Sequence, residues 1–143
     1  MIRIALLVMV VLLTTAHTAS AYTCAVTTAP APLNFGNLDP ALGTDVIVTT
    51  VVNIRCTGAG QNPITFTVTD DDGLYETGAN ANRMSNSTYP SEYLPYSFTY
   101  TTPVSGNKGQ VIPVTITGTV LGTLYQNASL GAYIDRVTIT VAP

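Results

Sequence analysis

A regular alternation of side chains runs from Asp45 to Cys56, and it constrains the fold more than any other part of the sequence. In an extended chain one face carries Val46, Val48, Thr50, Val52, Ile54 and Cys56, and the other carries Ile47, Thr49, Val51, Asn53 and Arg55. An apolar face, a mixed face and many β-branched side chains are typical of a strand with one side in a core. We therefore predict a central strand here, with Cys56 as its last inward residue.

Residues 1–21 have the pattern of a secretory signal. Arg3 supplies a positive start, residues 4–13 form an apolar run, and Ala19-Ser20-Ala21 is a small-residue cleavage site before Tyr22. The apolar run is about half of the roughly 20 residues that a transmembrane helix needs. We therefore predict a signal peptide over residues 1–21, a mature domain over residues 22–143, and secretion of that domain.

Two cysteines remain in the predicted mature chain, Cys24 and Cys56. Two cysteines in an exported protein most simply pair, because disulfides persist in oxidising compartments. A Cys24–Cys56 disulfide would attach the start of the mature chain to the central strand. Closing a loop of this size is worth roughly 3–4 kcal/mol on the chain-entropy estimate. The alternative is a pair of buried free thiols.

The charge of the mature chain excludes several classes of function. Its basic residues are Arg55, Arg83, Lys108 and Arg136, against eight aspartates and glutamates. Nucleic-acid binding needs clustered lysine and arginine, so this balance argues against it. The one histidine, His17, falls in the signal, and without a histidine or a free thiol Ser–His and Cys–His catalysis have no base.

Short alternating segments follow one another along the rest of the chain. We predict strands at residues 25–28, 64–69, 94–100, 112–120 and 133–141, a short one near Arg83-Met84, an irregular connection over 74–90 and a turn over 103–109. No stretch outside the signal has the apolar spacing of a helix. This pattern predicts one all-β domain, either an immunoglobulin-like sandwich or a barrel.

The predicted strands number about one fewer than the seven of an immunoglobulin-type sandwich. The final segment, 133–141, runs almost to the C-terminus and is strongly apolar. An unpaired apolar edge promotes aggregation unless another strand covers it. Either the fold closes in another way, or a partner supplies a strand.

Several blocks of sequence, in a fixed order, point to a known family. They are Tyr22-Thr23-Cys24, Leu33-Asn34-Phe35-Gly36 with Pro40, Ile54-Arg55-Cys56, Arg83-Met84, Leu94-Pro95-Tyr96 and the ending Gly131–Val141. Together they resemble the spore coat protein U domain, a family that includes subunits of the archaic bacterial chaperone–usher pili. The resemblance covers essentially the whole mature chain.

The resemblance implies an incomplete immunoglobulin-like sandwich that lacks its final strand. In such pilins a periplasmic chaperone first fills the gap, and the N-terminal extension of the next subunit then replaces it by donor-strand complementation. The implied partners are that chaperone, an outer-membrane usher and neighbouring pilus subunits. The implied locations are the periplasm and then a cell-surface fimbria for adhesion and biofilm. The donor-strand groove is expected between the first and last strands, lined by Leu33, Phe35, Val137, Ile139 and Val141.

The predicted cleavage site bears on the position of the subunit in a fibre. It leaves only Tyr22 and Thr23 before Cys24. A donor strand needs roughly ten residues or more, because a strand rises about 3.3 Å per residue. We therefore expect a subunit that accepts a strand and does not give one, which suits a terminal or tip position.

An acidic run, Asp70-Asp71-Asp72-Gly73, is the one candidate metal site in the sequence. Calcium binds clustered carboxylates, but the D-x-D-x-D-G spacing and a distal bidentate glutamate are missing, although Glu76 is near. A solvated turn is the preferred interpretation, so we predict no metal and no cofactor. Asp72 and Glu76 are also a carboxylate pair of the type glycosidases use, but nothing places them across a cleft.

Three tyrosines and two sequons complete the candidate sites. Tyr75, Tyr89 and Tyr93 lie in or beside the polar middle of the chain, where aromatic rings either grip a glycan or surface or simply cap the core. The second role is favoured. Asn86-Ser87-Thr88 and Asn127-Ala128-Ser129 match the glycosylation sequon, and in the bacterial context that the family implies we expect both to be bare.

Three hypotheses of function follow from the sequence. The first is a structural and adhesive subunit of a surface fibre that accepts a donor strand. The second is a self-contained, secreted or coat-associated binding module whose loops carry recognition. The third and weakest is a secreted hydrolase.

Overall fold

The computed structural model describes residues 22–143, and the predicted signal peptide lies outside these residues. The strands are β1 (Tyr22–Thr28), β2 (Val46–Gly58), β3 (Ile64–Asp70), β4 (Arg83–Asn86), β5 (Tyr93–Pro95), β6 (Ser97–Tyr100), β7 (Val104–Gly106), β8 (Val111–Val120), β9 (Tyr133–Ile134) and β10 (Ile139–Ala142), and the helix is α1 (Gly122–Tyr125). Among them there is no helix of the length and hydrophobicity needed to cross a membrane.

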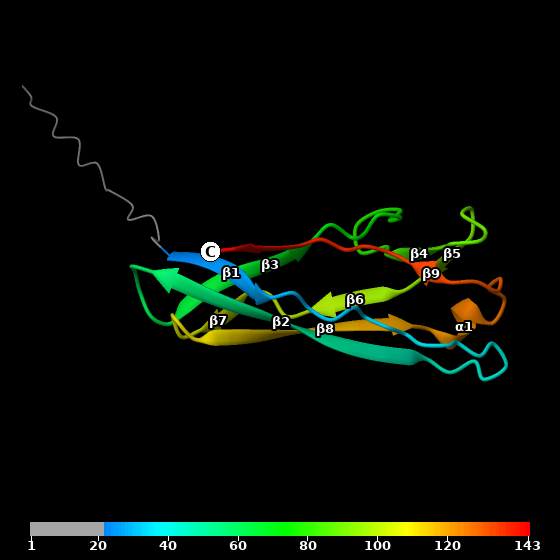
Figure 1. Ribbon diagram of the computed structural model, residues 1–143, viewed down its shortest axis with the longest axis horizontal. Coiled ribbons are helices and arrows are strands. Elements are labelled where there is room, and N and C mark those ends of the chain that lie inside the picture. Colours follow the sequence, from blue (N-terminus) through cyan, green and yellow to red (C-terminus); the bar gives the residue numbers. More distant parts are fainter. Residues whose placement is uncertain (1–21) are drawn as a thin grey trace, which may run out of the picture.

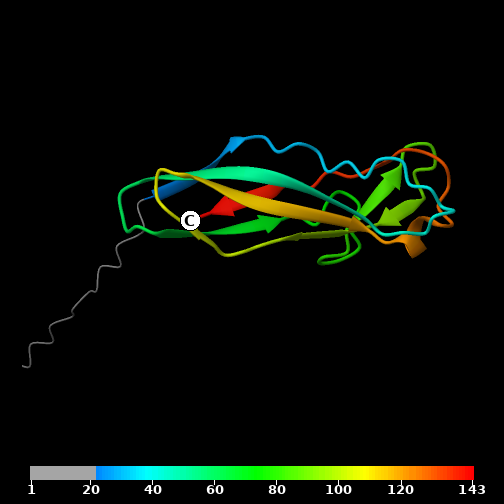
Figure 2. The same cartoon turned by 90° about the horizontal axis from the view of Figure 1, so that it is seen from below.

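The strands form an elongated two-layer sandwich in which every pairing is antiparallel (Figures 1 and 2). One layer is a four-stranded sheet in the order β1-β2-β8-β6, and the order β10-β3-β7 forms the facing sheet. A small sheet, β5-β4-β9, lies with α1 at one end of the molecule (Figure 1). The fold is an all-β, immunoglobulin-like sandwich, as predicted.

Strand β2 shows the predicted alternation, but its two halves differ in burial. Val52, Ile54 and Cys56 are buried, with at most 2% of their surface exposed. Val46 and Val48 point to the same face and pair with buried or glycine positions on β8, yet they are only half-buried. The inner face of β2 is therefore well covered at one end and poorly covered at the other.

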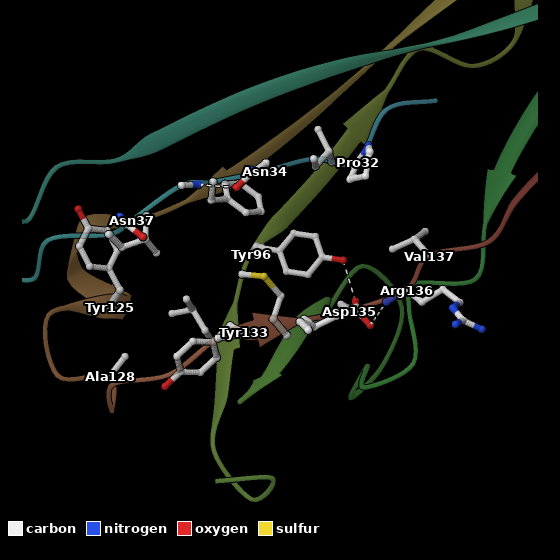
Figure 3. Close-up of a pocket in the computed structure, with 18 of the residues that line it drawn as sticks. Pro32, Asn34, Asn37, Tyr96, Tyr125, Ala128, Tyr133, Asp135, Arg136 and Val137 are labelled. Atoms are coloured by element: carbon white, nitrogen blue, oxygen red, sulfur yellow. Dashed lines mark hydrogen bonds between the residues drawn. The ribbon is translucent and has the colours of Figure 1, made fainter. Parts of the chain in front are cut away.

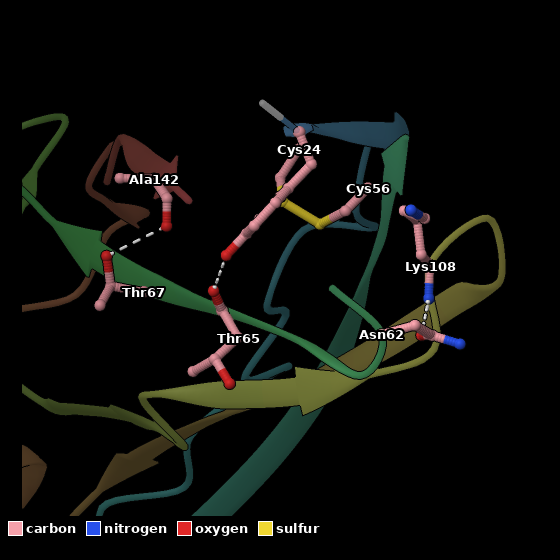
Figure 4. The surroundings of a disulfide bond; sticks show 8 residues. Cys24, Cys56, Asn62, Thr65, Thr67, Lys108 and Ala142 are labelled. Atoms are coloured by element: carbon pink, nitrogen blue, oxygen red, sulfur yellow. Dashed lines mark hydrogen bonds between the residues drawn. A yellow bond between two sulfur atoms is a disulfide. The ribbon is translucent and has the colours of Figure 1, made fainter. Parts of the chain in front are cut away.

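A disulfide joins Cys24 and Cys56, which face each other directly in the β1–β2 pairing. The hydroxyl of Tyr22, in the same strand, donates a hydrogen bond to the Thr65 carbonyl oxygen of β3 at 2.5 Å (Figure 4). Strand β1 is thus attached covalently to one layer and by a hydrogen bond to the other.

The core consists of two clusters of buried side chains. The larger one contains Tyr22, Val52, Ile54, Cys56, Ile64, Phe66, Val68, Ile112, Val114 and Ile116. The smaller one contains Met84, Leu94, Tyr96, Val120 and Tyr125. The larger cluster fills the space between the two main sheets, and the smaller one lies under the small sheet and α1. Partly buried side chains of β1 and β10 (Cys24, Ile139 and Val141) pack against the larger cluster, and Phe35, Leu38 and Val137, which lie outside the strands, pack against the smaller one.

Two predicted strands are interrupted. The segment 94–100 divides at Tyr96, whose backbone N–H donates to the Asn82 carbonyl oxygen at 3.1 Å, so β5 and β6 belong to different sheets. The segment 133–141 divides between Ile134 and Ile139, because β9 pairs with β4 whereas β10 pairs with β3.

Two short elements differ from the sequence prediction. The predicted turn over 103–109 contains β7, which pairs with β3 and whose Ser105 hydroxyl lies 2.9 Å from that of Thr65. The connection after β8 contains α1. Elements of three and four residues are too short for a period of 2 or 3.6 to be visible in a sequence.

Candidate functional site

Two strand edges lie unpaired on either side of the sandwich opening. Among the described residues β1 has β2 as its one hydrogen-bonded neighbour, and β10 has β3. After β1 the chain continues through residues 29–37 outside any sheet, held to β2 by a hydrogen bond from the Thr50 hydroxyl to the Ala31 carbonyl oxygen at 2.9 Å. The segment after β1 and the segment leading into β10 therefore form the two walls of an opening.

This opening is a groove of about 970 Å³. One wall consists of residues 30–38 and the other of residues 128–137 with Ile139; the floor contains Thr50, Met84, Leu94, Tyr96, Ile116 and Tyr125 (Figure 3). Because Ile116 belongs to the larger core cluster and Tyr96 and Tyr125 to the smaller, the groove lies over the junction of the two clusters.

Four of the five residues expected to line a groove do so. Leu33, Phe35, Val137 and Ile139 line it and are half-buried. Val141 does not line it and packs against the larger core cluster instead. Sequence reasoning missed the wall formed by residues 128–133, since that part of the chain has neither a strand pattern nor a helical one.

The Leu33–Gly36 block is positioned by a glycine on the opposite strand. A Cβ atom at Gly118 of β8 would lie 2.9 Å from Cζ of Phe35 and 3.1 Å from Cδ1 of Leu33. Because Gly118 has no side chain, the Phe35 ring and the Leu33 side chain have room to pack against the sheet. Phe35 also meets Tyr96 edge to face, with ring centroids 6.1 Å apart.

Asp135 supports the opposite wall; the sequence analysis included it in the Gly131–Val141 block but gave it no role at the site. Its carboxylate accepts hydrogen bonds from the Tyr96 hydroxyl at 2.7 Å (Figure 3) and from the Leu74 backbone N–H at 2.9 Å. Gly73 leaves room for it, because a Cβ there would lie 2.2 Å from an Asp135 carboxylate oxygen. Burial, and then the Asp135 carboxylate, raise the pKa of Tyr96 well above its ordinary value, so its hydroxyl stays protonated and donates. The sequence signal that could have pointed to Asp135 is its position as a single aspartate within the apolar alternating segment 133–141.

Asp71 holds the same segment from the other direction. Its carboxylate accepts a hydrogen bond from the Thr138 backbone N–H at 2.8 Å, and its own N–H donates to the Thr138 carbonyl oxygen at 3.2 Å. The hydrogen bond from Thr138 lowers the pKa of Asp71 below its ordinary value. Between β9 and β10 the chain makes no regular ladder pairing, and there the Asp71 and Asp135 carboxylates accept backbone hydrogen bonds instead.

The shifted pKa of Asp71 predicts a pH-dependent contribution to stability. A lowered pKa in the folded state means that the contribution is complete above about pH 4, the range of an unfolded aspartate, and is lost as the pH falls through the folded value. We expect Asp71→Asn to keep the hydrogen bond from Thr138 but to flatten the loss of stability below about pH 4. Urea unfolding between neutral and acid pH measures this. Glu76→Gln, at an exposed carboxylate, is the control and should follow the wild type.

Removal of Asp135 is expected to destabilise the groove wall. Asp135→Ala leaves the Tyr96 hydroxyl and the Leu74 N–H without an acceptor, for a predicted loss of about 2–3 kcal/mol. Tyr96→Phe removes one of these hydrogen bonds and should cost about 1 kcal/mol. Denaturant unfolding of the two variants and of the double variant measures the coupling. Fully additive effects would show that the two side chains do not act together.

The acidic run is a hydrogen-bonded turn. Asp70 accepts hydrogen bonds from the Tyr100 hydroxyl at 2.5 Å and the Asp72 N–H at 3.3 Å, and Asp72 accepts from the Asn80 N–H at 2.9 Å. Burial, followed by the hydrogen bond to Asp70, raises the pKa of Tyr100 to about 12. Residues 22–143 contain no cluster of three or more side chains suited to a metal ion.

The tyrosines of the middle region are partly structural. Tyr75 and Tyr93 have ring centroids 6.0 Å apart, and the Arg83 guanidinium lies 3.9 Å from the centre of the Tyr93 ring. The Arg83 Nε also donates to the Tyr75 carbonyl oxygen. This stack fastens the loop before β4 to β5. Tyr89 is separate from it and half exposed, at 51%.

The two sequons differ sharply in exposure. Asn127 is exposed, whereas Asn86 is buried, with 1% of its surface accessible. The Asn86 side-chain oxygen accepts hydrogen bonds from the N–H groups of Thr88 and Tyr89, at 2.8 and 3.1 Å. Asn86 is therefore a structural residue that closes the β4–β5 loop.

Fold and site together define a class of protein: a β-sandwich with an apolar groove between the segment that follows its first strand and the segment that leads into its last strand. The sequence model described as Spore Coat Protein U domain matches residues 10–140, and the chain belongs to this family. This confirms the family suspected from the sequence blocks. No curated protein sequence matches the chain significantly.

A solved structure has a similar fold. It is described as "Chaperone-tip adhesin complex is vital for synergistic activation of CFA/I fimbriae biogenesis", and one of its chains matches with a TM-score of 0.53 and 15% sequence identity. The match covers 86% of this chain and 41% of that chain, so this protein spans less than half the length of its structural relative. At this identity the likeness shows the fold alone.

Proposed function

We propose that this protein is an exported, non-enzymatic subunit of a pilus-type surface fibre, and that it accepts a β-strand from a partner in the groove. The observation that carries the proposal is the groove itself: the segment that follows β1 and the segment that leads into β10 face each other across a largely apolar floor, over the junction of two core clusters. Membership of the Spore Coat Protein U domain family supports it.

The energetics of strand addition suit these walls. A strand laid in the groove would form main-chain hydrogen bonds with one or both walls, and every second side chain would point to the floor. Its inward side chains would cover the half-buried Leu33, Phe35, Val137 and Ile139. Such burial is worth roughly 25 cal/mol per Å² of apolar surface. Backbone hydrogen bonds would thus supply affinity, and the floor would select the side chains.

The proposed partners are a periplasmic chaperone, then a neighbouring fibre subunit, with an outer-membrane usher at the point of export. The chaperone and subunit partners are supported by the structural relative, which is described as a chaperone–tip adhesin complex of fimbria biogenesis. The proposed route is therefore from the periplasm to the cell surface, where the fibre serves adhesion and biofilm formation.

A terminal or tip position in the fibre is part of the proposal. If the signal is removed after Ala21, the mature chain begins at Tyr22, which is already fixed in β1 by its pairing with Gly58 and its hydrogen bond to Thr65. No free segment then remains to be donated. Mass spectrometry of the exported protein tests this point: a mature N-terminus well upstream of Tyr22 would contradict it.

A synthetic peptide of about 12 residues that alternates isoleucine or valine with threonine is the probe for strand acceptance. We expect it to raise the melting temperature and to protect the backbone amides of residues 30–37 and 135–142 from hydrogen exchange. Ile139→Asp should abolish both effects, because Ile139 lines the groove. Thr140→Asp, on the opposite face of β10, should leave them intact. A stable protein that ignores the peptide would contradict strand acceptance and favour a self-contained binding module.

A further inference from the structure

Two prolines, Pro30 and Pro32, line the wall of the groove that follows β1. We call residues 30–38 the first wall, and residues 128–137 with Ile139 the second wall. Proline has no backbone N–H, so each proline removes one hydrogen-bond donor from the edge of an extended segment. The last paired residue of β1 is Thr28, so the missing donors affect the groove and not the β1–β2 pairing.

The two missing donors are on the edge of the first wall that faces the groove. In an extended chain the N–H and C=O of one residue point to the same edge, and successive residues use opposite edges. The Ala31 carbonyl oxygen points to β2, because it accepts a hydrogen bond from the Thr50 hydroxyl at 2.9 Å. Its neighbours Pro30 and Pro32 therefore present the other edge, on the side where a strand would be added.

The second wall, by contrast, directs backbone donors and acceptors toward the groove. Thr138 uses both of its backbone groups on Asp71: its N–H donates to the Asp71 carboxylate at 2.8 Å, and its carbonyl oxygen accepts from the Asp71 N–H at 3.2 Å. By the same alternation, the backbone groups of Val137 and Ile139 point to the opposite edge. Both residues line the groove, so this edge can pair with any extended chain that comes close to it.

The nearest extended chain is the first wall of the same molecule. The start of β1 and the end of β10 lie beside β3, since Tyr22 donates to the Thr65 carbonyl oxygen and the Ala142 carbonyl oxygen accepts from Thr67 (Figure 4). The two strands thus run in opposite directions, and they approach each other with Cα atoms within 8 Å. An antiparallel ladder that started there would reach residues 29–32 next, and it would close the groove.

We propose that Pro30 and Pro32 reserve the groove for a strand of another chain, because they prevent the protein from pairing its own two walls. The inference rests on the proposed function and deepens it, since it explains why the strand comes from a partner.

Little else would keep the two walls apart. Within the described residues one hydrogen bond, from the Thr50 hydroxyl, ties the first wall to a sheet, and the wall makes no other backbone pairing. Pro32 and Val137 lie on opposite sides of the groove (Figure 3). A ladder between the walls would lack the donors at positions 30 and 32, whereas a partner strand brings its own N–H groups to Val137 and Ile139. Prolines on exposed strand edges block unwanted pairing in the same way.

The test variant is Pro30→Val/Pro32→Val, because valine restores the N–H and favours extended strands. The matched control is Pro40→Val/Pro90→Val, which removes two prolines from turns and changes the unfolded chain in the same way. Hydrogen exchange is measured without any peptide. We expect the Val137 and Ile139 amides to exchange about tenfold more slowly in the test variant than in the wild type, and at the wild-type rate in the control.

Exchange of the β2 and β8 amides reports in the same experiment that each variant is folded. If the double variant does not fold, Pro32→Val alone is the second variant, and it should slow exchange at Val137 and Ile139 to a smaller extent.

Binding of the alternating peptide is the second readout. The test variant should bind it about tenfold more weakly than the wild type, because its own first wall competes for the same edge. Unchanged exchange at Val137 and Ile139 would show that the prolines do not keep the groove open, whether or not the wild type accepts the peptide. Tighter binding by the test variant would also contradict the proposal, since the prolines would then limit the incoming strand. If exchange slows as expected but the wild type binds no peptide, strand acceptance is wrong while the effect of the prolines on the groove stands.

Discussion

Replacement of both Cys24 and Cys56 by alanine is expected to lower the free energy of unfolding by about 3–4 kcal/mol. The two cysteines are 32 residues apart in sequence, and the disulfide restricts the unfolded chain by closing that loop. A further loss comes from the cavity left at Cys56, which is fully buried. For a domain of this size, whose total stability is of the order of 5–15 kcal/mol, this is the largest single loss we predict.

Urea unfolding of the variant and of the wild type with and without a reducing agent measures this effect. The reduced wild type is the informative control, because it loses the cross-link and keeps both sulfur atoms in the core. It should therefore be slightly more stable than the alanine variant. An unfolding midpoint that does not respond to reduction would contradict a structural role for the disulfide.

Sequence reasoning succeeded best where one side of a strand faces a continuous core. The phase of β2 was predicted correctly because Val52, Ile54 and Cys56 must all point inward, and a shift by one residue would place all three in water. The same kind of alternation predicted the strand over residues 112–120, which the structure contains as β8. The disulfide followed from the number of cysteines and from the predicted signal peptide, both of which are read from the sequence.

The breaks in the predicted strands could not be seen in the sequence. Alternation reports which side of a strand is buried, and it does not report which strand lies next to it. Tyr96 and Val137 both keep the phase of their segments, yet the ladder is interrupted beside each of them. The interruption at Val137 depends on Asp71 and Asp135, which meet their backbone partners only after distant segments have come together.

The groove could be predicted only in part, because alternation shows which side of a segment faces inward but not where an irregular loop lies. Leu33, Phe35, Val137 and Ile139 were proposed from the family resemblance, and they lie on segments whose pattern is simple. Val141 continues the alternation but packs against the larger core cluster and does not line the groove. The exit of the groove, near Leu130, depends on an irregular loop whose path is set by tertiary contacts.

One of those contacts gives the second large prediction: Asn86→Ala is expected to lower the free energy of unfolding by about 3 kcal/mol. Asn86 is fully enclosed and its oxygen accepts hydrogen bonds from the Thr88 and Tyr89 N–H groups, while its side-chain nitrogen donates to the Leu130 carbonyl oxygen at 3.4 Å. Alanine would leave two donors and one acceptor without these partners. A Cβ atom at Gly131 would lie 2.5 Å from the Asn86 oxygen, so the loop at the groove exit is packed directly against this side chain.

Asn86→Asp divides this effect into its parts, because it keeps the acceptor for Thr88 and Tyr89 and loses the donor to Leu130. We expect it to cost less than alanine when its carboxylate is ionised, and to loosen the groove exit selectively. Denaturant unfolding gives the stability, and hydrogen exchange at residues 128–133 gives the local effect. Asn127→Ala, at the exposed sequon, is the matched control and should change neither. If Asn86→Ala were as stable as this control, the loop would be held by its backbone contacts alone, and the groove exit would not depend on Asn86.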